Sequence, residues 1–191
     1  MKILFLGYEE SPVLDFLRTQ GEVTNVSPTG EIPNVTCDYL VSYGYRKIVS
    51  NSVLAQYPNR SVNLHISYLP WNKGADPNFW SWWDNTPKGV SIIEMTDKLD
   101  EGRIYAQREI LFSDDETLAS SYWKLRKEME NLFIETWPTL WTISPSEQVG
   151  EGSNHRVADL EALKERLRTA NGVEINWDLP LSSFKELHEL T

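Results

Sequence analysis

KILFLGYEESPVLDFLRTQGEVTNV, residues 2–26, contains a strand, a helix and a second strand in one short run. Residues 2–7 form an apolar run that ends in glycine, which is typical of a buried strand. A Ser-Pro pair suits the cap and first turn of a helix over residues 12–20, and a glycine follows it. Residues 22–26 alternate in polarity like a second strand. Because strand and helix succeed each other, this stretch predicts a parallel sheet flanked by helices.

The alternation of strand and helix continues further along the chain. Apolar runs predict buried strands over residues 39–42 and 61–66, with a short helix over residues 51–57 between them. Two more strand-like runs, residues 89–95 and 103–111, flank a polar turn and indicate a hairpin added to the sheet. The predicted fold class is therefore α/β: a Rossmann-like, mostly parallel sheet flanked by helices, with an added antiparallel hairpin.

Further helices are predicted after the fourth strand. Asp76 and Pro77 can begin a short helix that runs to Trp83. Apolar spacing from residue 117 predicts a long amphipathic helix, which Pro138 should kink or end. Two surface helices are expected near the C-terminus, over residues 158–169 and 181–190.

The chain length of 191 residues fits one domain with a sizeable core. Composition becomes polar after Ser144. We therefore predict a catalytic domain over residues 1–144 and a short C-terminal helical appendage of the same domain over residues 145–191. The first turn, GYEESP (residues 7–12), lacks the G-x-G-x-x-G that would seat a pyrophosphate, which disfavours a dinucleotide fold.

Charge and composition exclude several functional classes. The net charge is −10, with 28 acidic and 18 basic residues, and such a field repels nucleic acid. No apolar run approaches the ~18 residues of a membrane span, and the N-terminal run is too short for a signal peptide. We therefore expect a cytoplasmic protein with no membrane partner. Cys37 is the only cysteine, and the three histidines lack metal-ligand spacing, so no disulfide and no metal site is expected.

Asn63 and His65 are unusual residues for an apolar strand. They are two positions apart, so both side chains leave the same face of the strand. They lie near its C-terminal end, where open α/β sheets place their ligand crevice. For an isolated Asn-x-His pair, the commoner explanation is hydrogen bonding to neighbouring loops with no further role.

Asp100 strengthens the case for chemistry. It lies in the turn TDKLDEGR between the two hairpin strands. A carboxylate placed against an imidazole favours the charged form of the ring. Asn, His and Asp together suit amine attack on a carbonyl: Asn63 donates to the oxyanion, charged His65 stabilises the same charge, and Asp100 takes protons from the nitrogen. No serine or cysteine nucleophile is needed, so direct transfer is expected.

The runs VNLHISYLPWNKGADPNFW (residues 62–80) and PKGVSIIEMTDKLDEGRI (residues 87–104) resemble the catalytic core of the N10-formyltetrahydrofolate-dependent formyltransferases. That family shows Asn-x-His, then Ser-x-Leu-Pro, then a basic residue with Gly-Ala, and later a Leu-Asp-x-Gly turn. The resemblance covers about residues 39–112 well. It implies that Asn63, His65 and Asp100 are catalytic and that N10-formyltetrahydrofolate is the co-substrate.

The same resemblance implies two sets of binding residues. The folate pterin is expected beside the strand end over residues 45–49 and beside the aspartate turn over residues 96–99. The lysines of these segments can attract the glutamate tail, although solvated surface lysines are the commoner case. The implied cofactor-binding residues are Tyr45, Lys47, Ile48, Val49, Thr96, Asp97 and Lys98. The implied substrate-binding residues are Tyr68, Trp71, Lys73 and Trp80.

The acceptor implied by the resemblance is a nucleotide-linked amino sugar, as in the sugar N-formyltransferase branch. NKGADPNFW (residues 72–80) is similar to the loop of that branch. Two acids in the first turn, Glu9 and Glu10, disfavour the phosphate of glycinamide ribonucleotide. The residues that follow Ser144 are too few for the RNA-binding domain of methionyl-tRNA formyltransferases. Another small amine, including glycinamide ribonucleotide, and a non-catalytic folate-binding module stay open as alternatives, and so does a homodimer.

Overall fold

The structure is a computed structural model that describes residues 1–113, 115–178 and 180–183. Its main sheet has six strands in the order β2-β1-β3-β4-β6-β7, and a two-stranded sheet pairs β5 with β8. The strands are β1 (Lys2–Gly7), β2 (Glu22–Val26), β3 (Tyr39–Tyr43), β4 (Ser61–His65), β5 (Lys73–Gly74), β6 (Gly89–Glu94), β7 (Ile104–Glu109) and β8 (Asn154–His155). The helices are α1 (Pro12–Gln20), α2 (Asn51–Leu54), α3 (Pro77–Trp83), α4 (Leu118–Leu140) and α5 (Val157–Asn171), with a 3-10 turn at Leu181–Ser183.

The chain forms two compact units that interleave along the sequence. The first comprises Met1–His65, Ser91–Gln107 and Met129–Gln148. The second comprises Ile66–Val90, Arg108–Glu128 and Val149–Thr191. The division at residue 144 that the sequence suggests stays a prediction.

The first unit begins with β1, α1 and β2, and local signals explain their limits. Ser11 caps α1, its hydroxyl accepting a hydrogen bond from Leu14 N over 3.2 Å. Pro12 takes the first helical position, where its missing N–H costs nothing. Gly21 ends the helix by donating its N–H to Leu17 O. The chain then returns parallel to β1, as the strand–helix–strand pattern requires.

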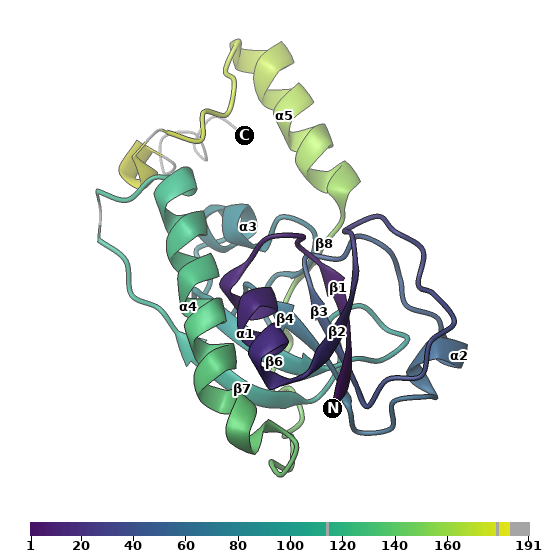
Figure 1. Ribbon diagram of the computed structural model, residues 1–191. Helices are drawn as coiled ribbons and strands as arrows, with labels where there is room; N and C mark the ends of the chain where they lie inside the picture. Colours follow the sequence, from purple (N-terminus) through teal and green to yellow (C-terminus); the bar gives the residue numbers. More distant parts are fainter. Residues whose placement is uncertain (114, 179, 184–191) are drawn as a thin grey trace. The chain divides into compact units, whose positions relative to one another are not determined.

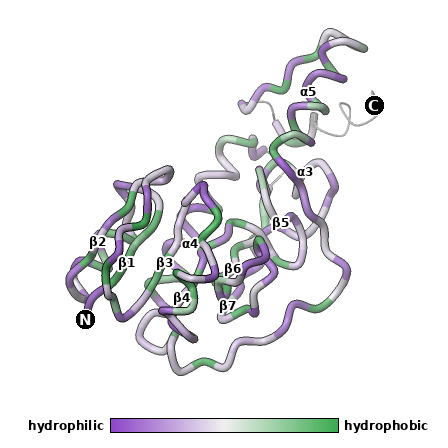
Figure 2. The backbone as a smooth tube through the Cα atoms, turned by 90° about the vertical axis from the view of Figure 1, so that its right-hand side faces the viewer, coloured by the Kyte–Doolittle hydropathy of each residue, from purple (hydrophilic) through white to green (hydrophobic). Residues whose placement is uncertain are grey.

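The two faces of the parallel strands in the first unit bury different side chains. On one face, Leu4, Leu6 and Leu40 form an apolar cluster with Val49 and Tyr57. On the other, Tyr39 of β3 stacks on Trp141 at a ring-centroid distance of 4.5 Å. Further rings of α1 and the C-terminal half of α4 pack together there, namely Phe16, Phe133 and Trp137. Figure 1 shows β2, β1, β3 and β4 side by side, and Figure 2 shows their hydrophobic stretches against more hydrophilic connections.

The strand pairing changes from parallel to antiparallel at β4, and this change positions the site. β3 and β4 run parallel, with Ser42 opposite Asn63. β4 and β6 run antiparallel, with His65 opposite Ser91. β6 and β7 are neighbours in the sheet, and the turn between them lies beside the face that carries Asn63.

The second unit has its own apolar core. The rings of Phe79 and Trp83 are stacked at 5.7 Å, and leucines of α4 and α5 pack on them. Its buried cluster comprises Phe79, Trp80, Trp83, Leu118, Leu160, Leu163, Leu167 and Leu181. Within the described parts of the chain, no helix is both long and apolar enough to cross a membrane. The cytoplasmic location and the homodimer stay predictions.

The predicted fold class is confirmed, and most predicted elements match within two residues. Three differ. The helix predicted over residues 51–57 ends at Leu54. Pro138 does not end α4 at its own position, because a proline removes only its own N–H bond; the helix ends at Leu140, within one turn of it. Of the helix predicted over residues 181–190, only residues 181–183 are described, as a 3-10 turn, and the rest lies outside the described residues.

Candidate active site

Asn63 and His65 occupy the C-terminal half of β4 in the first unit. The alternation of the strand turns both toward the face that carries Leu40 and Ser42 of β3. Val62 and Leu64 turn to the opposite face and are buried. His65 is buried and Asn63 is half-buried. The strand therefore presents an amide and an imidazole on the same side of the sheet.

Asp100 meets both of these side chains from the turn between β6 and β7. Asn63 Nδ2 donates a hydrogen bond to Asp100 Oδ1 over 3.1 Å. His65 Nδ1 lies 3.6 Å from Asp100 Oδ2, within ion-pair distance. The Asp100 side chain is only 4% exposed, so the carboxylate depends on these partners in place of water. The structure thus brings the three predicted catalytic residues together.

The conformation of the turn is closely determined. Asp100 has a φ of +55°, a left-handed conformation that aspartate tolerates better than most residues. At Gly102, an added Cβ would lie 1.8 Å from the carbonyl oxygen of Glu94. Arg103 donates two hydrogen bonds to the Glu94 carboxylate, over 2.8 and 2.9 Å, and these close the base of the turn.

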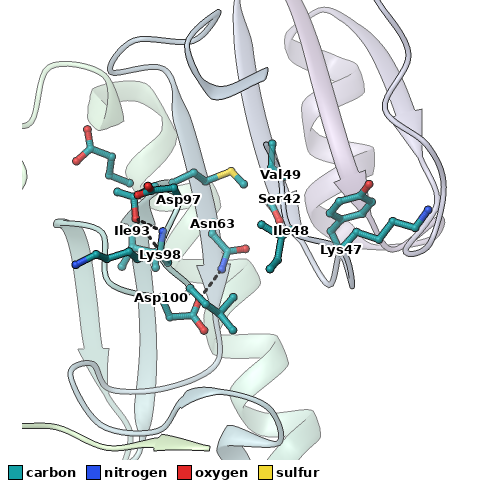
Figure 3. A pocket seen from close by; sticks show the side chains of 14 residues that line it. Ser42, Lys47, Ile48, Val49, Asn63, Ile93, Asp97, Lys98 and Asp100 are labelled. Carbon is teal, nitrogen blue, oxygen red and sulfur yellow. Dashed lines mark hydrogen bonds between the residues drawn. The ribbon is translucent and has the colours of Figure 1, made fainter. Parts of the chain in front are cut away.

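A pocket lies beside Asn63 and Asp100 in the first unit. It is an open cleft, with about 530 Å³ of empty space counted out into the solvent at its mouth. In Figure 3, Ile48 and Val49 lie on one side, Asp97 and Lys98 on the other, and the Asn63–Asp100 hydrogen bond between them. Its lining comprises Ser42, Tyr45, Lys47, Ile48, Val49, Asn63, Ile93, Glu94, Met95, Thr96, Asp97, Lys98, Leu99 and Asp100.

All seven predicted folate-binding residues line this pocket, but its two lysines have acidic partners. Lys47 pairs with Glu31, and the hydrogen bond and charge of the lysine lower the pKa of that carboxyl. Lys98 lies 3.5 Å from Glu101. In Figure 3, Lys47 extends away from Asn63. Tyr45 donates its hydroxyl to Gly30 O over 2.9 Å, and burial is the main cause of its raised pKa.

The four predicted substrate-binding residues all belong to the second unit. Tyr68, Trp71 and Lys73 lie in the segment between β4 and α3, with Lys73 in β5, and all three are half-buried. Trp80 lies in α3 and is buried, and one face of its ring stacks on His155 at 4.0 Å with an interplanar angle of 4°. That face is therefore occupied within the chain itself. The acceptor-binding role of the four residues stays a prediction.

A buried asparagine holds the segment of Tyr68, Trp71 and Lys73 in the second unit. Asn72 is fully buried with a φ of +56°, and its amide donates to Thr86 Oγ1 over 2.7 Å. The Ser153 hydroxyl accepts from Asn72 N over 2.8 Å and donates to Asn72 Oδ1 over 3.1 Å. The adjacent residues Lys73 and Gly74 pair with β8. The position of Lys73 is thus set by a segment far along the sequence.

Sequence reasoning missed two residues that line the pocket and one that contacts the Asp100 turn. Leu99 lies in the turn segment that the resemblance implied but was not singled out, although an apolar residue beside Asp100 is a signal. Ser42 follows from the register of β3 against β4, which no local pattern reveals. Gln148, in the segment that follows α4, contacts the backbone of the Asp100 turn, and no pattern near it in the sequence indicates this contact.

The site combines an amide donor, an imidazole and a buried carboxylate beside an open pocket. Such a set can stabilise negative charge on a carbonyl oxygen and accept a proton from an attacking nitrogen. Among the residues that the structure describes, no group of three His, Cys, Asp or Glu side chains is placed to hold a metal ion.

Comparison with known proteins points to the same chemistry. The family model for formyl transferases matches residues 18–137. The methionyl-tRNA formyltransferase of Listeria monocytogenes is 32% identical over 123 residues, which are 64% of this chain and 38% of that protein. The chain thus spans well under half the length of this curated relative.

Solved structures extend the similarity over nearly the whole chain. The formyltransferase PseJ from Anoxybacillus kamchatkensis is 37% identical, with a TM-score of 0.84 over 96% of this chain and 97% of that one. Its crystals contain UDP-4,6-dideoxy-4-formamido-L-AltNAc and tetrahydrofolate. A likely sugar N-formyltransferase from Mycobacterium tuberculosis shares the fold, with a TM-score of 0.75, 24% identity and coverage of 85% and 78%. The family expected from the sequence is confirmed: the chain belongs to the formyl transferases.

Proposed function

We propose that this protein transfers the formyl group of N10-formyltetrahydrofolate to the primary amine of a nucleotide-linked amino sugar. The observation that carries the proposal is the contact of Asp100 with both Asn63 and His65 beside an open pocket. The similarity to PseJ, crystallised with tetrahydrofolate and a formamido sugar nucleotide, supports the choice of both substrates.

The three side chains have distinct roles in the proposed reaction. The amine nitrogen attacks the formyl carbon, and negative charge develops on the formyl oxygen. Within the described residues, the Asn63 amide uses one N–H on Asp100, so its second N–H is available to that oxygen. Protonated His65 stabilises the same charge. Asp100 accepts a proton from the attacking nitrogen. As the bond from the formyl carbon to N10 breaks, Asp100 returns this proton to N10, which leaves as the secondary amine of tetrahydrofolate.

The folate site is proposed in the pocket of the first unit. Two apolar side chains at the pocket, Ile48 and Leu99, are 79% and 59% exposed, and such exposure beside a cleft is typical of ligand contacts. Covering them with an aromatic ring system would remove apolar surface from water. Polar groups of residues 94–98 line the same pocket and can fix the orientation of the rings.

The acceptor is proposed to contact the loop that holds Tyr68, Trp71 and Lys73. Half-buried aromatic rings suit contact with a sugar or base, and the ammonium of Lys73 suits a phosphate. Trp80 offers less ring surface for stacking on a ligand than the sequence suggests, because His155 covers one face of its ring. We assign it a role only through its edge or its remaining face.

A second candidate acceptor follows from the relatives in sequence. The Listeria protein is named for methionyl-tRNA, which makes charged transfer RNA a substrate to be tested. The net charge of −10 disfavours a polyanion. Glycinamide ribonucleotide and a folate-binding role without catalysis complete the alternatives.

The experiment compares acceptors that differ in one group. The purified protein is given N10-formyltetrahydrofolate with the 4-amino sugar nucleotide from which the PseJ formamide derives, or with its 4-hydroxy counterpart. The amine should gain one formyl group, whereas the hydroxyl compound should bind competitively and stay unmodified. Faster formylation of methionyl-tRNA or of glycinamide ribonucleotide would overturn the acceptor, and no transfer to any amine would favour the folate-binding module.

A further inference from the structure

Gln148 lies at the end of the first unit, in the segment that follows α4. The backbone of this segment is fastened to the start of β7. Ile104 N donates to Ser146 O over 2.7 Å, and Ser146 N donates to Ile104 O over 2.9 Å. This pair of bonds places Gln148, two residues further on, beside the turn that carries Asp100.

The side chain of Gln148 donates to the backbone of that turn twice. Its Nε2 donates to the carbonyl oxygen of Asp100 over 2.7 Å and to that of Gly102 over 2.9 Å. The opposite orientation of the amide would place Oε1 against two carbonyl oxygens, which repel it. The amide is therefore oriented with Nε2 toward the turn. The amide thus spans the residues on both sides of Glu101.

The other end of the amide is not satisfied. Gln148 Oε1 is buried, and no described residue donates to it. An unpaired buried acceptor lowers the free energy of unfolding. A contribution to stability alone therefore does not account for the Gln148 amide at this position. Its donors act on a turn whose conformation needs support, since Asp100 is left-handed at a φ of +55°.

We propose that Gln148 is a positioning residue that holds the Asp100 turn so that its carboxylate meets Asn63 and His65. Gln148 holds the turn whether or not substrates are bound, and the effect of this contact on catalysis rests on the proposed function. It extends the site to a residue beyond the stretch that the family model matches.

The first test measures the contact between Asn63 and Asp100 in the absence of any substrate. The side-chain amide of Asn63, which donates to Asp100 Oδ1, is followed by its ¹⁵N resonances and its hydrogen exchange. Gln148→Met keeps the length of the side chain and removes both donors. It should shift these resonances and speed their exchange, whereas the control Val149→Ala, at an exposed neighbour, should leave them unchanged. Unchanged Asn63 signals in folded Gln148→Met would overturn the proposal.

The second test separates positioning from general stability. Gln148→Met should lower kcat about 10- to 100-fold. In an Asp100→Asn background the same change should cost less than about two-fold, because the group it positions is already altered. Equal losses in both backgrounds would contradict the proposal. Should Gln148→Met fail to fold, Gln148→Asn, which retracts the amide by one methylene, takes its place in both tests. If the wild-type protein formylates no amine, the proposed function fails while the Asn63 resonances still decide the role of Gln148.

Discussion

Asn63 and Asp100 are joined by a hydrogen bond of 3.1 Å, from Nδ2 to Oδ1, although 37 residues separate them in sequence. The bond connects the central strand β4 to the turn between β6 and β7. The other oxygen of the same carboxylate faces His65 at 3.6 Å. One buried carboxylate therefore fixes the relative placement of the two groups that are proposed to stabilise the oxyanion.

Removing any member of this trio should abolish most of the activity. Asn63→Ala, His65→Ala and Asp100→Ala should each lower kcat by about 100-fold or more, because each removes an interaction made in the transition state. Double variants should lose much less than the product of the single losses. Steady-state rates and circular dichroism of each variant check this, and near-normal turnover by folded His65→Ala would rule out the mechanism.

The exposed apolar residues at the pocket should contribute to folate binding. Leu99→Ser and Ile48→Ser should each raise the Kd of tetrahydrofolate about ten-fold, since covering such a side chain is worth about 1.5–3 kcal/mol and part of it stays exposed. Leu111→Ser is the matched control, because Leu111 is 82% exposed and does not line the pocket. Calorimetric titration measures all three, and equal affinities for the pocket variants and the control would place the folate elsewhere.

The turn should not tolerate a side chain at Gly102. In Gly102→Ala the new Cβ would lie 1.8 Å from Glu94 O, so the turn must move. We expect a loss of about 1–3 kcal/mol of unfolding free energy, together with most of the activity. The control is Gly172→Asn, because an added Cβ at Gly172 would meet no atom of the other described residues within 4 Å and asparagine tolerates its left-handed conformation. A Gly102→Ala variant as stable and active as this control would contradict the described turn.

Activity should not depend on a divalent ion. The proposed roles of the trio use hydrogen bonds and proton transfer, with no step that needs a Lewis acid. Dialysis against EDTA should leave the rate of formyl transfer unchanged. Loss of activity that only a divalent ion restores would require a different mechanism.

The sequence predicted those parts of the fold that local patterns determine. β1, α1 and β2 match their predicted limits because an apolar run, a Ser-Pro cap and a glycine stop act within a few residues. The approach of Asp100 to Asn63 and His65 was also expected, though from a family resemblance. Their catalytic roles remain predictions.

Other features of the site depend on contacts between distant segments. The stacking of Trp80 on His155 could not be foreseen, since a tryptophan near a loop gives the same sequence signal whether its face is open or covered. Gln148 reaches the Asp100 turn only because the chain after α4 pairs with Ile104. Such contacts arise from the packing of whole elements, which periodicity in one segment does not encode.

The proposed reaction is direct transfer of a formyl group from folate to an amine. A single-turnover reaction with N10-[¹³C]formyltetrahydrofolate and the 4-amino sugar nucleotide, followed by NMR, reports on this transfer. We expect the ¹³C signal to move from the folate to a formamide on the sugar as tetrahydrofolate appears in equal amount, and we expect Asp100→Asn to slow this conversion. Release of the label as free formate, or a label that stays on the folate in the presence of every amine tried, would contradict it.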